Sequence, residues 1–119
     1  MDNLTTLTAI SPVDGRYWSR TKGVATYFSE LAIIKYRIRV EIEYLISLSE
    51  KARVVRRLKS SEKKNLRELV NKFSLDDALK IKDIEKTTNH DLKAVEYFLK
   101  EKISRTSLSD LQEIGRAHV

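Results

Sequence analysis

Residues 27–49 read YFSELAIIKYRIRVEIEYLISLS, a long helical pattern that decides the fold class. Apolar residues recur along it at the three- and four-residue spacing of one helix face. They are Leu31, Ile34, Ile38, Leu45 and Leu48, with Ile42 beside them. A second apolar stripe on a different side of the same helix consists of Ile33, Val40 and Tyr44. A surface helix needs only one apolar face, so we expect this helix to be sandwiched between neighbours.

Three further helices are predicted after this stretch. The first covers residues 61–73, and Ser61 caps it only partially because Lys64 stands where a full capping box has glutamate. The second begins at Ser74, whose two following aspartates complement the helix dipole. The third ends near Ile103. The residues expected to face inward are Leu66, Leu69, Val70, Phe73, Leu75, Ala78, Leu79, Ile81, Ile84, Leu92, Val95, Phe98, Leu99 and Ile103.

Residues 1–25 are predicted to form an irregular arm. Ser11-Pro12 starts a turn and Asp14-Gly15 marks another, since proline fixes φ and glycine permits positive φ. We therefore predict an all-α fold in which residues 1–112 form one domain, with the arm at residues 1–25 and helices from about residue 26 to about residue 105.

The composition is that of a water-soluble helical domain. The chain has 119 residues, of which 41% are hydrophobic and 34% charged, and it contains no cysteine. The missing cysteines exclude disulfides and thiolate metal sites, and they fit a reducing compartment. No apolar run approaches the roughly 20 residues of a membrane span, and no secretory signal is recognisable. We expect a cytoplasmic protein without a membrane partner.

The formal charge of +6 is concentrated in one stretch of the sequence. Its basic residues are Lys51, Arg53, Arg56, Arg57, Lys59, Lys63, Lys64 and Arg67. Such runs are usually solvated surfaces, and this one lacks the interleaved aromatic residues on which nucleic-acid bases stack. A small basic helical module that binds nucleic acid through this stretch is therefore kept only as an alternative.

The last seven residues match the translation of a sequencing adapter. Residues 113–119 read EIGRAHV, which is the translation of GAG-ATC-GGA-AGA-GCA-CAC-GTC, the start of a widely used sequencing adapter. We therefore expect this segment to be a non-native read-through tail, in which Arg116 and His118 carry no function.

The first stretch that could carry chemistry is residues 11–17, SPVDGRY. It combines a rigid turn with a guanidinium and a phenol side by side, at Arg16 and Tyr17. Arginine binds phosphate and carboxylate groups with a planar pair of hydrogen-bond donors. The alternative interpretation is a polar loop in which Arg16 pairs with a nearby aspartate.

The second stretch is residues 87–91, TTNHD, between two predicted helices. Thr88 or Asn89 can cap the second helix, and Asp91 suits its first turn. Unpaired N–H groups at a helix start can bind an anion, and His90 could donate a hydrogen bond or a proton there. The alternative is simple capping, with His90 solvated and idle.

Two segments resemble the bacterial adenylosuccinate lyase family. They are residues 7–17, LTAISPVDGRY, and residues 84–102, IEKTTNHDLKAVEYFLKEK, in the right order and about 70 residues apart. Phe28-Ser29-Glu30, Lys35-Tyr36-Arg37 and Glu41 fit the same pattern. The resemblance implies the all-α N-terminal helical domain of the fumarase and aspartase superfamily, without the long-helix bundle core.

The resemblance also implies a function. Enzymes of this family eliminate fumarate from adenylosuccinate, giving AMP, and from the succinylated carboxamide ribotide of purine synthesis. Arg16 and Tyr17 are then expected to contact the phosphoribosyl part of the substrate. Asn89, His90 and Asp91 are expected to line the same site, with His90 as a hydrogen-bond donor that aids proton transfer. Another lyase of the superfamily, such as an argininosuccinate lyase, is the sibling alternative.

The same resemblance sets limits on what this chain does alone. The family uses no metal and no organic cofactor, and it works as a homotetramer whose subunits share each active site. Its Thr-Ser-Glu loop, its main acid–base histidine and its mobile serine loop are not in this sequence. We therefore expect the 119-residue chain to be inactive by itself.

Overall fold

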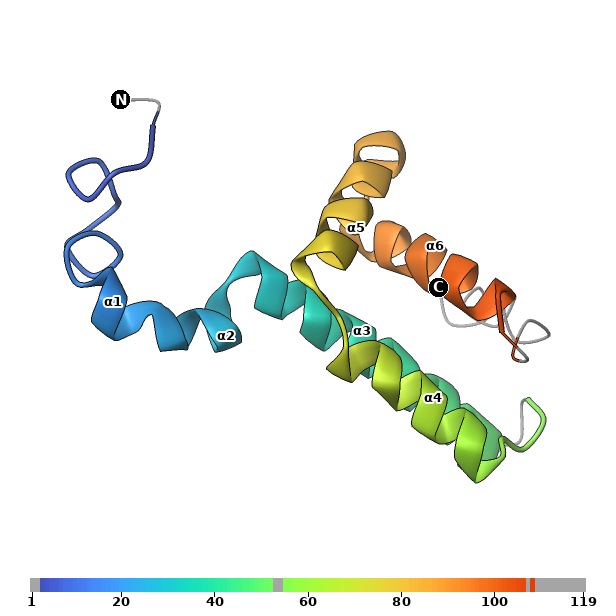
Figure 1. Ribbon diagram of the computed structural model, residues 1–119. Coiled ribbons are helices and arrows are strands. Elements are labelled where there is room, and N and C mark those ends of the chain that lie inside the picture. The colour runs from blue at the N-terminus through green and yellow to red at the C-terminus, as the bar shows by residue number, and fades with distance from the viewer. Residues whose placement is uncertain (1–2, 53–54, 107, 109–119) are drawn as a thin grey trace. The chain divides into compact units, whose positions relative to one another are not determined.

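The computed structural model describes residues 3–52, 55–106 and 108. All regular elements in this part of the chain are helical, which confirms the all-α prediction (Figure 1). In chain order they are α1 (Trp18–Thr21), the 3₁₀ turn η1 (Lys22–Val24), α2 (Ala25–Phe28), α3 (Glu30–Ser47), the π-helical turn η2 (Leu48–Ala52), α4 (Ser60–Asn71), α5 (Leu75–Thr88) and α6 (Asp91–Ser104). The predicted tail at residues 113–119 lies outside the described residues.

The chain divides into two units, Met1–Ile33 and Ile34–Val119. The first unit is built from short-range turns. The Asp14 carboxylate accepts the N–H of Ser11 at 2.8 Å, and Gly15 donates to the Ser11 carbonyl at 3.0 Å. The predicted irregular arm ends earlier than expected, because the first helix, α1, begins at Trp18.

This first unit has almost no core of its own. Among its described residues only Gly15 and Ala32 are buried. Most of its large apolar side chains are exposed, and the most exposed are Leu7 at 94% and Ile10 at 97%. The unit is therefore held by backbone turns rather than by packing of apolar side chains.

Helix α3 begins later than the sequence pattern predicts. The expected start was Tyr27, but the backbone is extended at Ser29, with ψ of 162°. The Ser29 hydroxyl accepts the N–H of Ala32 at 3.1 Å, as a capping serine does. Ser29 therefore ends α2 and starts α3, although periodicity alone runs through it.

The second unit contains the apolar core of the chain. Its fully buried side chains include Ile38 and Ile42 of α3, as the first apolar stripe predicts. The predicted core residues that are buried here are Ile34, Ile38, Ile42, Leu45, Leu66, Val70, Phe73, Ala78, Ile81, Val95, Phe98, Leu99 and Ile103. Phe73 and Phe98 meet edge to face, with ring centroids 5.9 Å apart.

Several predicted core positions are exposed instead. The second stripe of α3 is 44% exposed at Ile33, 64% at Val40 and 41% at Tyr44, so the expectation that it is sandwiched is wrong for the described structure. Leu75, Leu79 and Leu92 are also more than half exposed. Periodicity identifies an apolar face but does not say whether another element covers it.

Of the two helix starts predicted from serines, one agrees with the structure and the other does not. Ser74 stands at the start of α5, as predicted, and the structure shows that it caps the helix: its hydroxyl accepts the N–H of Asp77 at 3.3 Å, and Asp77 accepts the N–H of Ser74 at 3.1 Å. The predicted cap at Ser61 is wrong. The first turn of α4 is closed by Glu62, which accepts the N–H of Lys59 at 2.9 Å. Lysine has no acceptor to return that bond, so this cap is one-sided.

Helices α5 and α6 pack side by side as a hairpin (Figure 1). The second candidate stretch, residues 87–91, spans the end of α5, the turn between the two helices and the first residue of α6. Among the described residues, no helix is long and apolar enough to cross a membrane.

Candidate functional site

The turn between α5 and α6 is made by Asn89. It has a left-handed backbone with φ of 53° and ψ of 28°, and its N–H donates to the Glu85 carbonyl at 2.7 Å. Asparagine is one of the few residues that adopts this conformation at low cost. Asn89 therefore ends α5, and the prediction that Thr88 or Asn89 caps the next helix is wrong.

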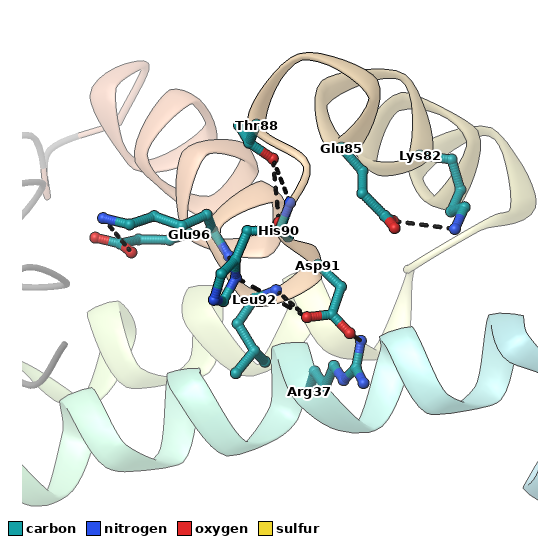
Figure 2. A network of polar contacts seen from close by, with 9 residues as sticks. Arg37, Lys82, Glu85, Thr88, His90, Asp91, Leu92 and Glu96 are labelled. Atoms are coloured by element: carbon teal, nitrogen blue, oxygen red, sulfur yellow. Dashed lines mark hydrogen bonds and ion pairs between the residues drawn. The ribbon is translucent and has the colours of Figure 1, made fainter.

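His90 is the residue that caps α6 (Figure 2). Its Nδ1 atom accepts the backbone N–H of Lys93 at 3.2 Å. The Thr88 hydroxyl accepts the His90 N–H at 3.3 Å and donates to the His90 carbonyl at 3.1 Å, which fixes the extended backbone. An accepting Nδ1 carries no proton, so the neutral imidazole bears its proton on Nε2. The side chain is 58% exposed, so this Nε2–H group is accessible.

Asp91 is held by two contacts in the first turn of α6. One carboxylate oxygen accepts the N–H of Leu92 at 2.8 Å, and the other lies 2.9 Å from Nη1 of Arg37 on α3 (Figure 2). The hydrogen bond from Leu92 and the charge of Arg37 lower the pKa of Asp91. Asp91 is therefore an ionised group that joins α6 to α3.

These contacts change one expectation about the start of α6. Unpaired N–H groups there were expected to offer an anion site. Leu92 instead donates to Asp91, Lys93 to the His90 ring, and Ala94 to the His90 carbonyl at 3.1 Å. The N–H groups of residues 92–94 are thus paired within the chain and are not free to bind an anion.

An open hollow of about 320 Å³ lies beside the same turn. It is lined by Lys82, Glu85, Lys86 and Asn89. Within it Lys82 pairs with Glu85 at 3.0 Å, whereas the Lys86 side chain is 80% exposed and lies 3.5 Å from Asp83. The hollow is therefore lined by two lysines that each lie close to a carboxylate, by Glu85 and by the Asn89 that makes the turn.

Arg16 and Tyr17, the other predicted pair, lie in the first unit. The Arg16 guanidinium lies 4.6 Å from the centroid of the Tyr17 ring and donates to its hydroxyl. The alternative in which Arg16 pairs with an aspartate does not occur with Asp14, whose carboxylate instead accepts the backbone N–H groups of Ile10 and Ser11. These hydrogen bonds lower the pKa of Asp14, the one from Ser11 having the largest effect.

Sequence reasoning missed one member of the junction, Arg37. It lies far from Asp91 in the sequence, and a long-range ion pair leaves no local pattern. The only signal was its position in the stretch Lys35-Tyr36-Arg37, which fits the family pattern. Among the described residues, no three potential metal-binding side chains come together.

The chain is similar in sequence to several curated proteins that are all adenylosuccinate lyases. No protein-family model matches the chain. A curated adenylosuccinate lyase from Dictyostelium discoideum is 56% identical over 104 residues, which is 84% of this chain and 22% of that protein. The adenylosuccinate lyases of Vibrio cholerae and Escherichia coli are 50% and 46% identical over 103 residues, 85% of this chain and 23% of each relative. The chain thus spans about a fifth of the length of these relatives.

Proposed function

Because the chain is homologous to a segment of the adenylosuccinate lyases, we propose that it is the N-terminal part of such an enzyme. The complete enzyme eliminates fumarate from adenylosuccinate, giving AMP, and from the succinylated carboxamide ribotide of purine synthesis. The observation that carries the proposal is the identity of 46–56% to these three lyases over more than four fifths of the chain. The relatives do not support the argininosuccinate lyase or the nucleic-acid alternative.

In this proposal the α5–α6 turn supplies one wall of the substrate site. His90 presents its Nε2–H as a hydrogen-bond donor, while its Nδ1 is already used to cap α6. A donor at this position can bind a carboxylate of the succinyl group and aid transfer of a proton. Asn89 contributes the turn that aims His90, and Asp91 holds the turn in place.

Arg16 and Tyr17 take the phosphoribosyl part of the substrate in this proposal. Stacking on the Tyr17 ring limits the freedom of the Arg16 guanidinium, which lowers the entropic cost of binding a phosphate. We further propose that the complete enzyme is a cytoplasmic homotetramer that needs no metal or organic cofactor, and that each active site is shared between subunits. Residues 1–112 are then the N-terminal domain of the lyase, and residues 113–119 are a non-native read-through tail.

The charge pattern supports this proposal over nucleic-acid binding. Three of the basic residues between positions 51 and 67 are paired with acidic side chains of the same unit. Arg56 pairs with Glu62 at 2.8 Å, Arg67 with Glu43 at 3.0 Å, and Lys63 with Glu50. Cations already paired inside the chain contribute less to binding phosphates.

The proposal is tested by grafting residues 1–106 into the Escherichia coli lyase in place of the segment that they match. We expect the graft to release fumarate from adenylosuccinate, and His90→Ala to reduce kcat/KM by about a hundredfold or more, as loss of a positioned acid–base group does. The control is Lys72→Ala, because the Lys72 side chain is 80% exposed. This substitution is expected to change kcat/KM little. The 119-residue chain alone is expected to show no turnover.

Two results would contradict the proposal. One is a graft that assembles like the parent enzyme but releases no fumarate. The other is an active graft in which His90→Ala and Lys72→Ala behave alike, which would remove the α5–α6 turn from the substrate site.

A further inference from the structure

The α5–α6 turn is tied to α3 by one residue to which the proposed function gives no role. Arg37 projects from α3 toward the start of α6, and its Nη1 lies 2.9 Å from the Asp91 carboxylate (Figure 2). We infer that Arg37 is a positioning residue, which fixes the direction of the His90 Nε2–H by holding Asp91. This inference rests on the proposed function, since it concerns the donor that the substrate site would use.

The contacts form a short chain from Arg37 to the imidazole. Arg37 holds one oxygen of Asp91, and the other oxygen accepts the N–H of Leu92, so the ion pair fixes the first residues of α6. The N–H of the next residue, Lys93, donates to Nδ1 of His90. A shift of this turn would release Nδ1 and allow the ring to rotate or to change tautomer. Arg37 therefore acts on His90 through the backbone of the turn.

The exposure of the pair shows that stability is not its main effect. The Arg37 and Asp91 side chains are 34% and 47% exposed, and ion pairs at such positions contribute little to the free energy of unfolding. Orientation is more sensitive than stability, because a small misplacement of a reacting group lowers a rate strongly. Loss of Arg37 should thus change the turn without unfolding the helix hairpin.

The chain offers a matched control for this idea. Arg67 on α4 also pairs with a carboxylate on α3, donating to Glu43 through Nε at 3.1 Å and through Nη2 at 3.0 Å. That pair is similarly exposed, at 53% and 48%, and includes none of residues 87–94. Arg37→Met and Arg67→Met each remove one arginine–carboxylate link to α3, but only the first touches the turn.

The first experiment uses the 119-residue chain and two NMR measurements, amide hydrogen exchange and the ¹⁵N shifts of the His90 ring. In Arg37→Met we expect the Lys93 amide to exchange about tenfold faster or more, and the neutral ring to move from the Nε2–H form toward a mixture of tautomers. Arg67→Met should leave both unchanged, and Arg37→Lys should recover part of the effect because one donor suffices for the observed contact. Equal behaviour of Arg37→Met and Arg67→Met would overturn the inference.

The second experiment measures turnover in the active graft. We expect Arg37→Met to lower kcat/KM by about tenfold, mainly through kcat, with partial recovery in Arg37→Lys and no change in Arg67→Met. An active graft that tolerates Arg37→Met overturns the positioning role and leaves the proposed function standing. A folded graft without turnover contradicts the proposed function itself, while amide exchange still reports whether Arg37 fixes the turn.

Discussion

The two units of the chain are both rich in apolar residues but use them differently. In Met1–Ile33 the side chains of Leu7 and Ile10 are almost fully exposed. In Ile34–Val119, Ile38 is 0% and Val95 1% exposed. The second unit repeats its apolar residues at helical spacing, whereas the first interrupts them with turns. Apolar content alone therefore does not build a core, and the two units should respond differently to the same substitution.

The largest expected effect separates the two units directly. Ile38→Ala removes a fully buried side chain and should cost about 2–5 kcal/mol of unfolding free energy, through lost burial and a cavity. Leu7→Ala in the exposed arm should stay within about 0.5 kcal/mol. Urea unfolding followed by far-ultraviolet circular dichroism measures both. Equal losses in the two variants would show that the arm is packed after all.

A smaller effect is expected from the one-sided cap of α4. Two hydrogen bonds from Arg56 and one from the Lys59 N–H lower the pKa of Glu62 from 4.5 to about 2. Glu62→Gln should cost about 1–3 kcal/mol at neutral pH, since it weakens charge-assisted hydrogen bonds of a buried group. Because the folded pKa is the lower one, this stabilisation is complete above about pH 4.5 and is lost as the pH falls toward 2.

Urea unfolding at a series of pH values checks this prediction. The difference between the wild-type chain and Glu62→Gln should shrink steadily as the pH falls below 4.5. A difference that stays constant down to pH 2 would mean that the Glu62 carboxylate is not stabilised by its partners.

The next smaller effect on the unfolding free energy is expected at the helix caps, where two serine substitutions can be compared. Ser74 caps α5, whereas Ser61 lies inside the first turn of α4. Ser74→Ala should lower the unfolding free energy by about 1 kcal/mol, and Ser61→Ala should cost nothing, because alanine is the better helix former. Thermal unfolding of the two variants decides the comparison, and a destabilising Ser61→Ala would restore the cap predicted from sequence.

The smallest global effect is expected in the arm, at Gly15. A Cβ atom at this position would lie 2.6 Å from the Thr6 carbonyl oxygen, so Gly15→Ala must change the local turn. The second unit has its own core and should keep its unfolding midpoint. Amide chemical shifts should therefore move near Thr6 and stay constant around Ile38. Widespread shifts in the second unit would mean that the two units are coupled.

The sequence predicted what depends on local pattern. The buried stripe through Ile38 follows from apolar spacing, and the helix start at Ser74 follows from the residues on either side of it. The start of α3 differs from the prediction because Ser29 has an extended backbone and caps the helix, although the apolar periodicity continues through it. The exposure of Val40 was missed because a pattern marks an apolar face without naming what covers it.

The candidate site shows the same limit. The stretch around His90 was predicted from sequence, but its structural role was not. Thr88 and Asn89 are the more usual caps, yet Asn89 is the residue that adopts the left-handed turn, which leaves the cap to His90. Arg37 could not be predicted from local spacing, because its ion pair depends on how α3 and α6 pack.

The measurement that tests the central claim most directly is the ¹⁵N spectrum of the His90 imidazole in the neutral form. The α5–α6 turn is a scaffold that presents one defined donor. We predict a proton on Nε2 and an unprotonated Nδ1 that is hydrogen-bonded to the Lys93 N–H. A ring with its proton on Nδ1, or an even mixture of the two tautomers, would contradict this account of the turn and of His90 as the donor to substrate.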